Sequence, residues 1–273
     1  MSNSHIHIKA GQVYKNYLRD IWHYRDLAYV LSWRDVKVRY KQTAIGIIWA
    51  LIRPLFTIVV FTLVFGHVAG FRLEEPIPYI LIALTGVLPW QLLSSGITEA
   101  SASLVGNERL ITKVYFPRVL IPASTLLTAI LDFCIAYIIA LVVFWAYGLI
   151  PNFQWLFVIP WLIWAAMLTL GIGLWLSALN VRYRDFRHAL PFFIQAGLFI
   201  SPVGFLTQRI PVKWQLLYQL NPVAGLIDSF RWSVLGGEFP YQSAIIGLSL
   251  TGLIFVFGFV YFRSAEKAFA DWI

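Results

Sequence analysis

The sequence predicts an all-α integral membrane protein with six transmembrane helices, an N-terminal amphipathic interface helix, and two short re-entrant outer helices between spans five and six. Its composition is the first reason: 59% of the 273 residues are hydrophobic, only 12% are charged, and the mean hydropathy is +0.73. A soluble domain typically has about 25% charged residues, and a water-soluble fold of this size could not hide so much apolar surface. Long apolar runs and an uneven distribution of basic residues are the other two reasons.

The N-terminal region, residues 1–46, is expected to be cytoplasmic. Its first part is polar and has no apolar core, so no cleavable signal peptide is expected. Residues 31–43 should form a helix with apolar groups on one face and basic groups on another: Trp33, Val36 and Tyr40 opposite Arg34, Lys37 and Lys41. This pattern is typical of a helix in the membrane interface, and a solvated juxtamembrane stretch is the alternative.

Six apolar runs have the roughly 17–25 residues that a membrane-spanning helix needs. They are residues 45–65, 77–97, 119–147, 155–179, 190–206 and 244–262, which together define a transmembrane domain over 47–262 and leave 263–273 as a tail. Of the 21 Lys and Arg residues, 16 lie in the termini and in alternate connections, and only four lie in the other connections. Basic residues concentrate on the cytoplasmic side, so both termini are expected there, in a multi-pass protein of the inner membrane.

The segment between the second and third runs, residues 103–118, combines charge with hydrophobicity. Its last twelve residues read Asn-Glu-Arg-Leu-Ile-Thr-Lys-Val-Tyr-Phe-Pro-Arg. Orientation by basic residues places this segment in the cytoplasm. A connection that is basic, apolar and aromatic suits a surface that touches a partner, whereas the alternative is a positive-inside loop with lipid-facing aromatic groups.

The region 207–240 is too polar to span the membrane as one helix and too apolar for an exposed loop. It divides into expected helices at 211–219 and 222–235, with Asn221 as the N-cap of the second and Gly236-Gly237 as its end. Short apolar helices of this kind suit re-entrant or interfacial positions. A pair lying on the outer surface is the alternative.

Several kinds of chemistry have no counterpart in the sequence. No Gly is followed by Lys, so a phosphate-binding P-loop is absent, and the single Cys134 excludes an internal disulfide. The histidines do not cluster as metal ligands would, and no paired carboxylates lie within the spans. Arg53, beside Pro54, is either a snorkelling anchor or a contact for an anionic head group. Asp132 either lines a cavity or is a hydrogen-bonded packing residue.

Four blocks of the sequence resemble ABC-2 type permeases that export polysaccharides, the O-antigen and teichoic-acid export permease family. The segment 107–118 resembles the cytoplasmic coupling segment of that family, and Leu-Asn-Val-Arg-Tyr-Arg-Asp-Phe-Arg at 179–187 resembles its loop between spans four and five. Residues 221–231, Asn-Pro-Val-Ala-Gly-Leu-Ile-Asp-Ser-Phe-Arg, resemble its outer helix. Residues 34–40, 46–49 and 53–54 resemble its interface helix and first span. The four blocks occur in the family's order, and the resemblance covers about residues 30–262.

The resemblance implies the permease subunit of an ATP-driven exporter rather than an enzyme. Such a permease moves a lipid-linked polysaccharide, O-antigen or a similar glycan on undecaprenyl diphosphate, from the cytoplasm across the inner membrane. It works as a homodimer with two copies of a separate P-loop ATPase, which carries the ATP and Mg. No cofactor, metal or nucleic acid is expected on this chain.

Three sets of candidate site residues follow from the resemblance and the charge pattern. ATPase coupling is assigned to Asn107, Glu108, Arg109, Leu110, Lys113, Tyr115, Phe116, Pro117 and Arg118. The lipid diphosphate and interface are assigned to Arg34, Lys37, Arg39, Lys41 and Arg53. The outer gate is assigned to Asn221, Pro222, Asp228 and Arg231, where the last two are expected to pair locally rather than across a two-fold axis. Aromatic faces pack well on sugar rings, and Tyr79, Trp90 and Phe199 are candidates for the channel wall.

Three other functions compete with this interpretation. An ABC-2 exporter of a smaller amphiphile, such as a lipid or drug, would share the coupling segment. A membrane glycosyltransferase would need clustered acidic residues facing one leaflet. A secondary transporter would show inverted repeats with broken helices in both halves, and only the second half has a broken region.

Overall fold

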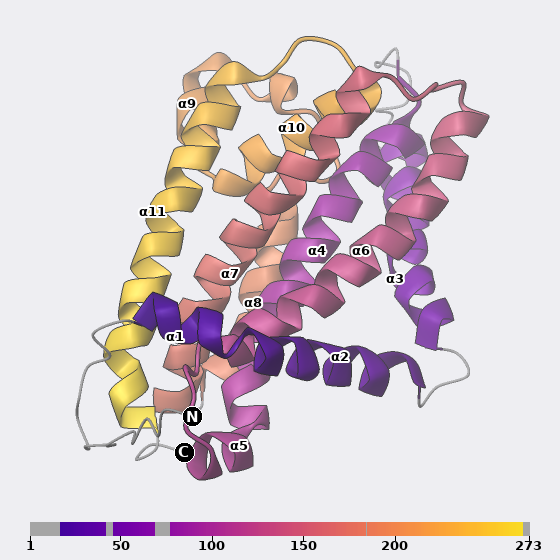
Figure 1. Cartoon of the computed structure of the whole chain (residues 1–273). Helices are drawn as coiled ribbons and strands as arrows, with labels where there is room; N and C mark the ends of the chain where they lie inside the picture. Colours follow the sequence, from indigo (N-terminus) through magenta and orange to yellow (C-terminus); the bar gives the residue numbers. More distant parts are fainter. Residues whose placement is uncertain (1–16, 42–45, 69–76, 184, 270–273) are drawn as a thin grey trace.

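The computed structural model describes residues 17–41, 46–68, 77–183 and 185–269, and every regular element in these ranges is helical (Figure 1). The N-terminal elements are α1 (Tyr17–His23), α2 (Arg25–Lys41) and α3 (Gly46–Phe61), which continues into the π-helical segment η1 (Thr62–Val68). The middle of the chain forms α4 (Tyr79–Gly106), α5 (Glu108–Lys113), α6 (Leu120–Ala146), η3 (Phe153–Phe157) and α7 (Val158–Arg182). The remainder forms α8 (Phe186–Ile200), η4 (Thr207–Arg209), α9 (Val212–Gln219), α10 (Pro222–Leu235), α11 (Tyr241–Ala265) and η5 (Glu266–Ala268).

Four helical stretches of the described residues are long and apolar enough to cross a membrane. They are Tyr79–Gly106, Leu120–Ala146, Phe153–Arg182 and Tyr241–Ala268. The other two expected spans form shorter apolar helices, Leu55–Gly66 and Phe186–Ile200. The described part of the chain is therefore all-helical, and its long helices have the length and composition of membrane spans. The run expected at 190–206 becomes a helix that starts earlier and stops at Ile200, because the next six residues leave helical geometry.

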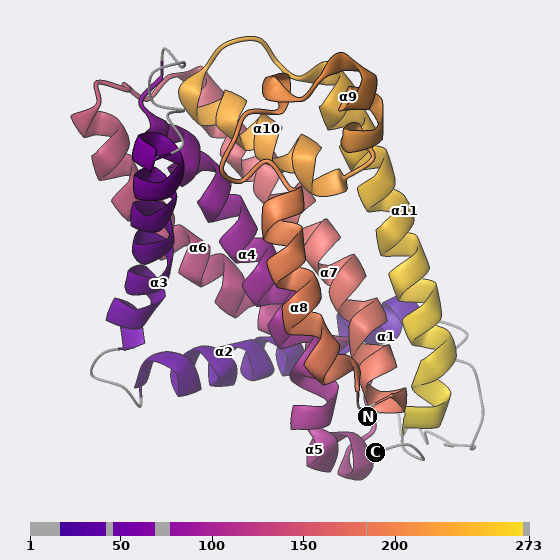
Figure 2. The ribbon, with the colours of Figure 1, turned by 180° about the vertical axis from the view of Figure 1, so that it is seen from behind.

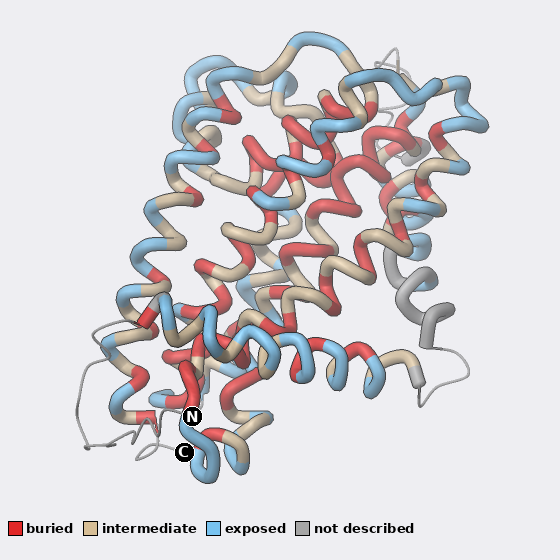
Figure 3. The backbone as a smooth tube through the Cα atoms, viewed as in Figure 1, coloured by how far each residue is buried: buried red, intermediate tan, exposed pale blue. Residues whose placement is uncertain are grey.

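The bundle is built around α4, whose most extensive contacts are with α7 and α6, while α7 also packs closely along α11. Buried residues run along α4 and α7 in Figure 3. Small residues permit the closest helix contacts. A Cβ added at Gly258 of α11 would lie 2.1 Å from the carbonyl oxygen of Gly171 in α7, so these two backbones touch directly.

Two ends of the bundle differ in character. At one end, called the α5 end, α2 lies across the ends of the long helices, beside α1 and α5 (Figures 1 and 2). A hydrophobic cluster there joins α1, α2, the segment after α5, and the last turns of α7 and α11. At the opposite end, called the α10 end, α9 and α10 close over the bundle. The larger hydrophobic cluster lies between the two ends and extends to α10.

The interface helix is longer than the expected 31–43, because α2 begins at Arg25. Its buried positions are Leu31, Ser32 and Val36, whereas Trp33 is 47% exposed. The expected apolar face is therefore rotated: Val36 faces the bundle and Trp33 faces outward. Helix α2 packs on α6 along this buried face.

Candidate functional site

The candidate coupling segment leaves α4 through a single linking residue, Asn107. Its side-chain amide donates to the carbonyl of Ser103 at 2.8 Å, and its own carbonyl accepts from Leu110 at 3.0 Å. Helix α5 then occupies Glu108–Lys113, and Val114 is already extended. The helix stops at Lys113 because the chain turns inward after it, where Phe116 and Pro117 are buried before α6 begins.

The segment divides sharply into an exposed half and a buried half. The exposed half presents two basic groups and two apolar groups: Arg109, Lys113, Val114 and Tyr115, next to exposed Glu108. Leu110 is half-buried. Phe116 is 2% exposed and belongs to the cluster at the α5 end, and Pro117 is buried beside it. Phe116 is therefore an anchor into the chain's own bundle, which removes it from the surface that a partner would contact.

Arg118 is also occupied within the chain. Its backbone N–H donates to Oε1 of Glu266 at 2.7 Å, and its guanidinium donates to the carbonyl of Glu266. The other carboxylate oxygen of Glu266 accepts from the hydroxyl of Tyr17 at 2.9 Å, and the guanidinium lies 6.0 Å from the ring of Phe269. The base of the coupling segment is thus fastened to α1 and to the end of α11. Sequence reasoning missed Glu266 and Tyr17, because partners so distant in the chain leave no local pattern.

A second polar network fastens the interface helix to the spans. The guanidinium of Arg39 in α2 forms ion pairs with Glu99 of α4 and Asp132 of α6. Tyr40 donates to Asp132, and Thr128 donates to the other oxygen of Glu99 at 2.8 Å. Burial raises the pKa of the Tyr40 phenol, and its hydrogen bond to Asp132 raises that pKa further, so Tyr40 remains a donor.

This network changes the assignments made for Arg39 and Asp132. Arg39 was a candidate ligand for a lipid diphosphate, but two carboxylates already hold its guanidinium. Asp132 is 8% exposed and is paired with Arg39 and Tyr40, which makes it a hydrogen-bonded residue between helices. A buried carboxylate needs such partners. The acid in α4, Glu99, was not singled out from the sequence.

The other candidate interface cations differ in their surroundings. Arg34 is exposed and pairs with its neighbour Asp35 at 2.7 Å. Lys37 is exposed, with its ammonium 5.7 Å from the ring of Trp33. The side chains of Lys41 and Arg53 lie outside the described part of the structure. Of the candidate cations, Arg34 and Lys37 are therefore the two with described side chains that face outward from α2.

At the α10 end, Asn221 and Pro222 begin α10 as the sequence pattern indicated. The side-chain oxygen of Asn221 accepts from the N–H of Val223 at 3.0 Å, and its amide donates to Ser201 at 3.1 Å. Pro222 occupies the first helical turn, where its missing N–H costs nothing. Gly236 and Gly237 end the helix with φ of 82° and 90°, values that favour glycine.

Arg231 is the centre of the α10 end. It is 5% exposed, and its guanidinium donates to the carbonyls of Phe205 at 2.9 Å, Val203 at 3.2 Å and Ile82 at 3.3 Å. Asp228 lies 3.8 Å away on the same helix. The carbonyls of Phe205 and Val203 belong to the irregular residues 201–206 after α8, and irregular backbone away from water needs partners for its polar groups. Arg231 supplies them.

The pairing of the two gate charges is local, at i and i+3, and Asp228 also accepts from Thr207 at 2.9 Å. The irregular residues 201–206 also lie against the backbone of α4. A Cβ added at Gly86 of α4 would lie 2.0 Å from the carbonyl oxygen of Val203. The segment is therefore clamped between α4 and α10.

The three candidate channel aromatics occupy different environments. Tyr79 is 3% exposed and its hydroxyl donates to the carbonyl of Gly204 at 2.7 Å, so most of it packs inside the bundle, although it also lines a cavity beside Phe205 and Arg209. Trp90 is half-buried against Gly197 of α8. Phe199 of α8 is 60% exposed. Only Phe199 presents most of its ring to the surroundings.

Comparisons with known proteins give the family. Residues 26–235 match the family model described as ABC-2 type transporter. Over 248 residues the chain is 31% identical to the O-antigen export system permease protein RfbA of Klebsiella pneumoniae, covering 90% of this chain and 94% of that protein. It is 25% identical to RfbA of Myxococcus xanthus over 93% of this chain and 98% of the relative. It is 24% identical to the polysialic acid transport protein KpsM of Escherichia coli over 86% and 92% of the two chains. The chain therefore belongs to the ABC-2 type transporter family.

Proposed function

We propose that this chain is the membrane permease of an ATP-driven exporter that moves a lipid-linked polysaccharide from the cytoplasm across the inner membrane. The observation that carries the proposal is the similarity along nine-tenths of the chain to permeases named for O-antigen export. The glycan would be O-antigen or a similar polymer on undecaprenyl diphosphate. Two copies of the chain would pair with two copies of a P-loop ATPase, which would hold the ATP and Mg.

In this proposal the α5 end faces the cytoplasm and the α10 end faces outward. The excess of Lys and Arg in the termini and in the connections at the α5 end supports this orientation. The chain then crosses the membrane six times, with α3 and its continuation η1 as the first span and α8 as the fifth. Helix α8 has 15 residues, about 22 Å, and a hydrocarbon core is about 30 Å thick. The irregular residues 201–206, held by Arg231, would complete that fifth crossing.

The ATPase would contact the exposed half of the coupling segment. Val114 and Tyr115 are the apolar groups available to a groove on the partner, and Arg109 and Lys113 would orient the contact by charge. Arg109 and Lys113 are four residues apart on α5, so they lie on one helical face. Motion of α5 would pass directly into α4 through Asn107, and into α1 and α11 through the Arg118–Glu266 contacts.

The lipid diphosphate would meet the exposed cations of α2. Arg34 and Lys37 face outward, and Lys41 and Arg53 remain candidates from their sequence positions. Arg39 would act indirectly, by fixing α2 to Glu99 and Asp132. The exposed aromatic ring of Phe199 on α8 would offer a face on which sugar rings slide.

The coupling contact is tested by charge reversal of Arg109→Glu together with Lys113→Glu. These residues are exposed and make no contact with the described residues comparable to that of Arg118, so the variant should insert and fold normally. We expect co-purification of the ATPase subunit to fall at least about tenfold, since like-charge contacts across an interface cost several kcal/mol. Lys213→Glu, an exposed reversal on α9, is the matched control and should leave co-purification unchanged. Equal ATPase recovery from both variants would refute the assignment.

The transported substrate is tested by deleting the gene and measuring polysaccharide on both sides of the membrane. Loss of surface polysaccharide with accumulation of lipid-linked polymer inside the cell is the expected result. The wild-type chain should restore export, and the Arg109→Glu, Lys113→Glu variant should not. Normal surface polysaccharide in the deletion strain, with altered tolerance to a small amphiphile, would instead favour an exporter of lipids or drugs.

A further inference from the structure

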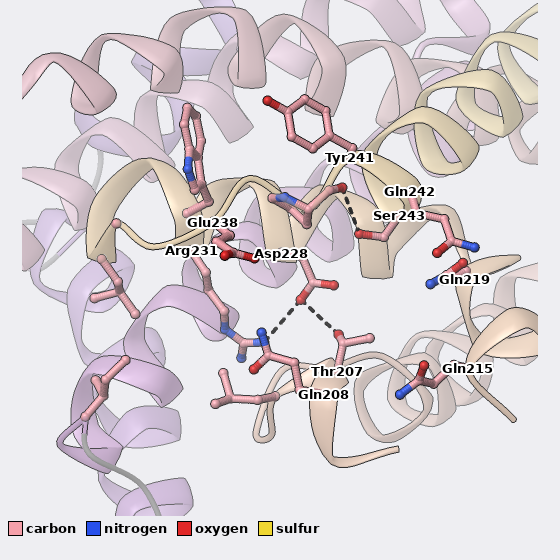
Figure 4. Close-up of a pocket in the computed structure, with 16 residues that line it drawn as sticks. Thr207, Gln208, Gln215, Gln219, Asp228, Arg231, Glu238, Tyr241, Gln242 and Ser243 are labelled. Atoms are coloured by element: carbon pink, nitrogen blue, oxygen red, sulfur yellow. Dashed lines mark hydrogen bonds and ion pairs between the residues drawn. The ribbon is translucent and has the colours of Figure 1, made fainter. Parts of the chain in front are cut away.

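A cavity of about 360 Å³ opens at the α10 end, between η4, α9, α10 and the first turn of α11. Figure 4 shows the residues that line it. Gln208, Tyr241 and Gln242 at its rim are exposed, and the Asp228–Arg231 pair forms its inner wall. It lies apart from the coupling segment and from the interface helix.

The lining is unusual for this apolar chain because it collects side-chain amides. Four of the nine glutamines of the sequence line the cavity, from three different elements: Gln208, Gln215, Gln219 and Gln242. In Figure 4 the amides of Gln215, Gln219 and Gln242 lie on one side and Thr207 and Asp228 face them. Each amide has two donors and an acceptor oxygen. A wall of this kind matches a ligand that both donates and accepts many hydrogen bonds.

Some of this hydrogen-bonding capacity is unused. The Oε1 atom of Gln219 is buried and has no hydrogen-bond partner among the described residues, and the same holds for Nε of Arg231. Gln215 is held in place by donating to the carbonyl of Ile210 at 3.0 Å. Unsatisfied buried polar atoms are uncommon in folded proteins and each needs an explanation. If the amide of Gln219 turned toward the cavity, a hydroxyl group of an occupant could donate to this oxygen.

The charge of the cavity argues against an anionic ligand. Arg231 is paired with Asp228 and is already bonded to three backbone carbonyls, and the remaining charged residue among the described residues of the lining is the acid Glu238. Within this described lining, no uncompensated cation is left for a phosphate. Two aromatic rings complete the wall: Tyr241, which is 70% exposed, and Trp232, which is held edge-on by neighbouring aromatic rings.

We propose that this cavity is a saccharide-binding site that takes a neutral pyranose unit of the polymer as it leaves the membrane. The amides and Asp228 would bind its hydroxyl groups, and the aromatic rings would pack on its C–H face. Small-ligand pockets span about 300–1,000 Å³, so a cavity at the lower end of that range holds one or two sugar rings. The inference rests on the proposed function, because it takes the exported polysaccharide as the source of the sugar.

The cavity shares residues with the contacts that hold the irregular segment 201–206 in place. Asp228 and Arg231 belong both to the cavity wall and to the contacts that hold that segment. A sugar bound at Asp228 therefore touches the same charge pair that fixes the backbone at this end.

The test is cysteine protection with the intact exporter. Gln242→Cys is introduced in a Cys134→Ser background, and spheroplasts are treated with a membrane-impermeant maleimide. Cells that synthesise the polymer are compared with cells in which its first sugar transferase is inactive. We expect labelling to be about threefold slower in polymer-making cells, which corresponds to about two-thirds occupancy of one site. Asn152→Cys, exposed between α6 and η3 at the same end, is the matched control and should label at one rate in both strains.

Equal labelling of Gln242→Cys in the two strains overturns the proposal, and so does equal protection of both positions, which indicates general shielding. A lipid head group in the cavity would also give equal rates. A second variant, Gln219→Leu, should lower the export rate about fivefold, the loss typical of one hydrogen bond, with ATPase co-purification unchanged. Gln154→Leu, at a glutamine outside the cavity lining, should export normally. Export that persists without this chain would refute the proposed function, whereas normal export by Gln219→Leu refutes only the cavity.

Discussion

Arg39 is predicted to be the residue that holds the interface helix against the spans. Arg39→Met keeps an unbranched apolar stem of similar length and removes the charge that Glu99 and Asp132 share. Removing one partner of a fully buried ion pair costs about 3–5 kcal/mol, while an exposed pair contributes about 0–1 kcal/mol. The side chains of Arg39 and Glu99 are 30% and 29% exposed and that of Asp132 is 10% exposed. The expected loss therefore lies between these limits, at about 2–3 kcal/mol.

The assay is the apparent melting temperature of the purified chain in one detergent. For a chain of this size about 1 kcal/mol corresponds to about 2–4 °C, so Arg39→Met should melt roughly 4–12 °C lower. Arg34→Met on the same helix is the control: it breaks the exposed pair with Asp35 and should shift melting by less than about 4 °C. Adding Asp132→Asn to Arg39→Met should cost less than the two single losses together, because both changes act on one network. Equal melting of wild type and Arg39→Met would refute the reasoning.

Two further predictions concern close packing and the gate. Gly258→Val should lower the melting temperature by about 3–10 °C, because its side chain would meet the carbonyl of Gly171 and overpacking typically costs about 1–3 kcal/mol. Gly252→Ala on the same helix is its control, because an added Cβ there meets nothing within 4 Å, and this variant should melt at or above the wild-type temperature. An equal fall in melting temperature in both variants would contradict the contact between Gly258 and Gly171. Arg231→Met should speed amide hydrogen exchange in the irregular segment after α8 while leaving α5 unchanged, and unaltered exchange there would show that the guanidinium does not hold the segment.

The long helices could be predicted from sequence because the membrane imposes a length. A helix must carry an apolar run that matches the hydrocarbon thickness, and hydropathy alone reports that. Helices α4, α6, α7 and α11 accordingly fall on four of the expected runs. The end of α8 was misplaced because residues 201–206 are apolar without being helical. Pro202 was the available signal, since the residue before a proline is disfavoured in helical geometry.

The polar contacts could not be assigned from sequence, because the partners are far apart along the chain. Glu266 contacts Tyr17, which lies 249 residues earlier in the chain, and Arg118, which lies 148 residues earlier. Arg39 likewise pairs with Glu99 and Asp132, which lie on other helices. An acid within a span indicates that some cation lies nearby, but the sequence offers 21 candidates. The sequence also could not show which residues of the coupling segment are exposed and which are buried. Phe116 is turned inward only by the fold.

Helix α4 joins the two ends of this molecule. It is 28 residues long, about 42 Å, and it continues into the exposed coupling helix through one residue, Asn107. At its other end the carbonyl of Ile82 accepts from Arg231, and Gly86 touches the backbone of residues 201–206. Because α4 is enclosed by its neighbours over most of its length, a displacement applied at α5 cannot be absorbed by lateral movement into lipid.

Within α4, Pro89 lies about one turn from Gly86 and about two turns from Ile82. A proline in a helix interior lacks the N–H that would bond four residues back, and it is a common site of bending. The part of α4 that precedes Pro89 can therefore change direction without unwinding the rest of the helix. Such a bend would move Ile82 and Gly86 together against the clamp made by Arg231. The contacts of Ile82 and Gly86 at the α10 end thus lie on one side of Pro89, and the candidate coupling segment lies on the other.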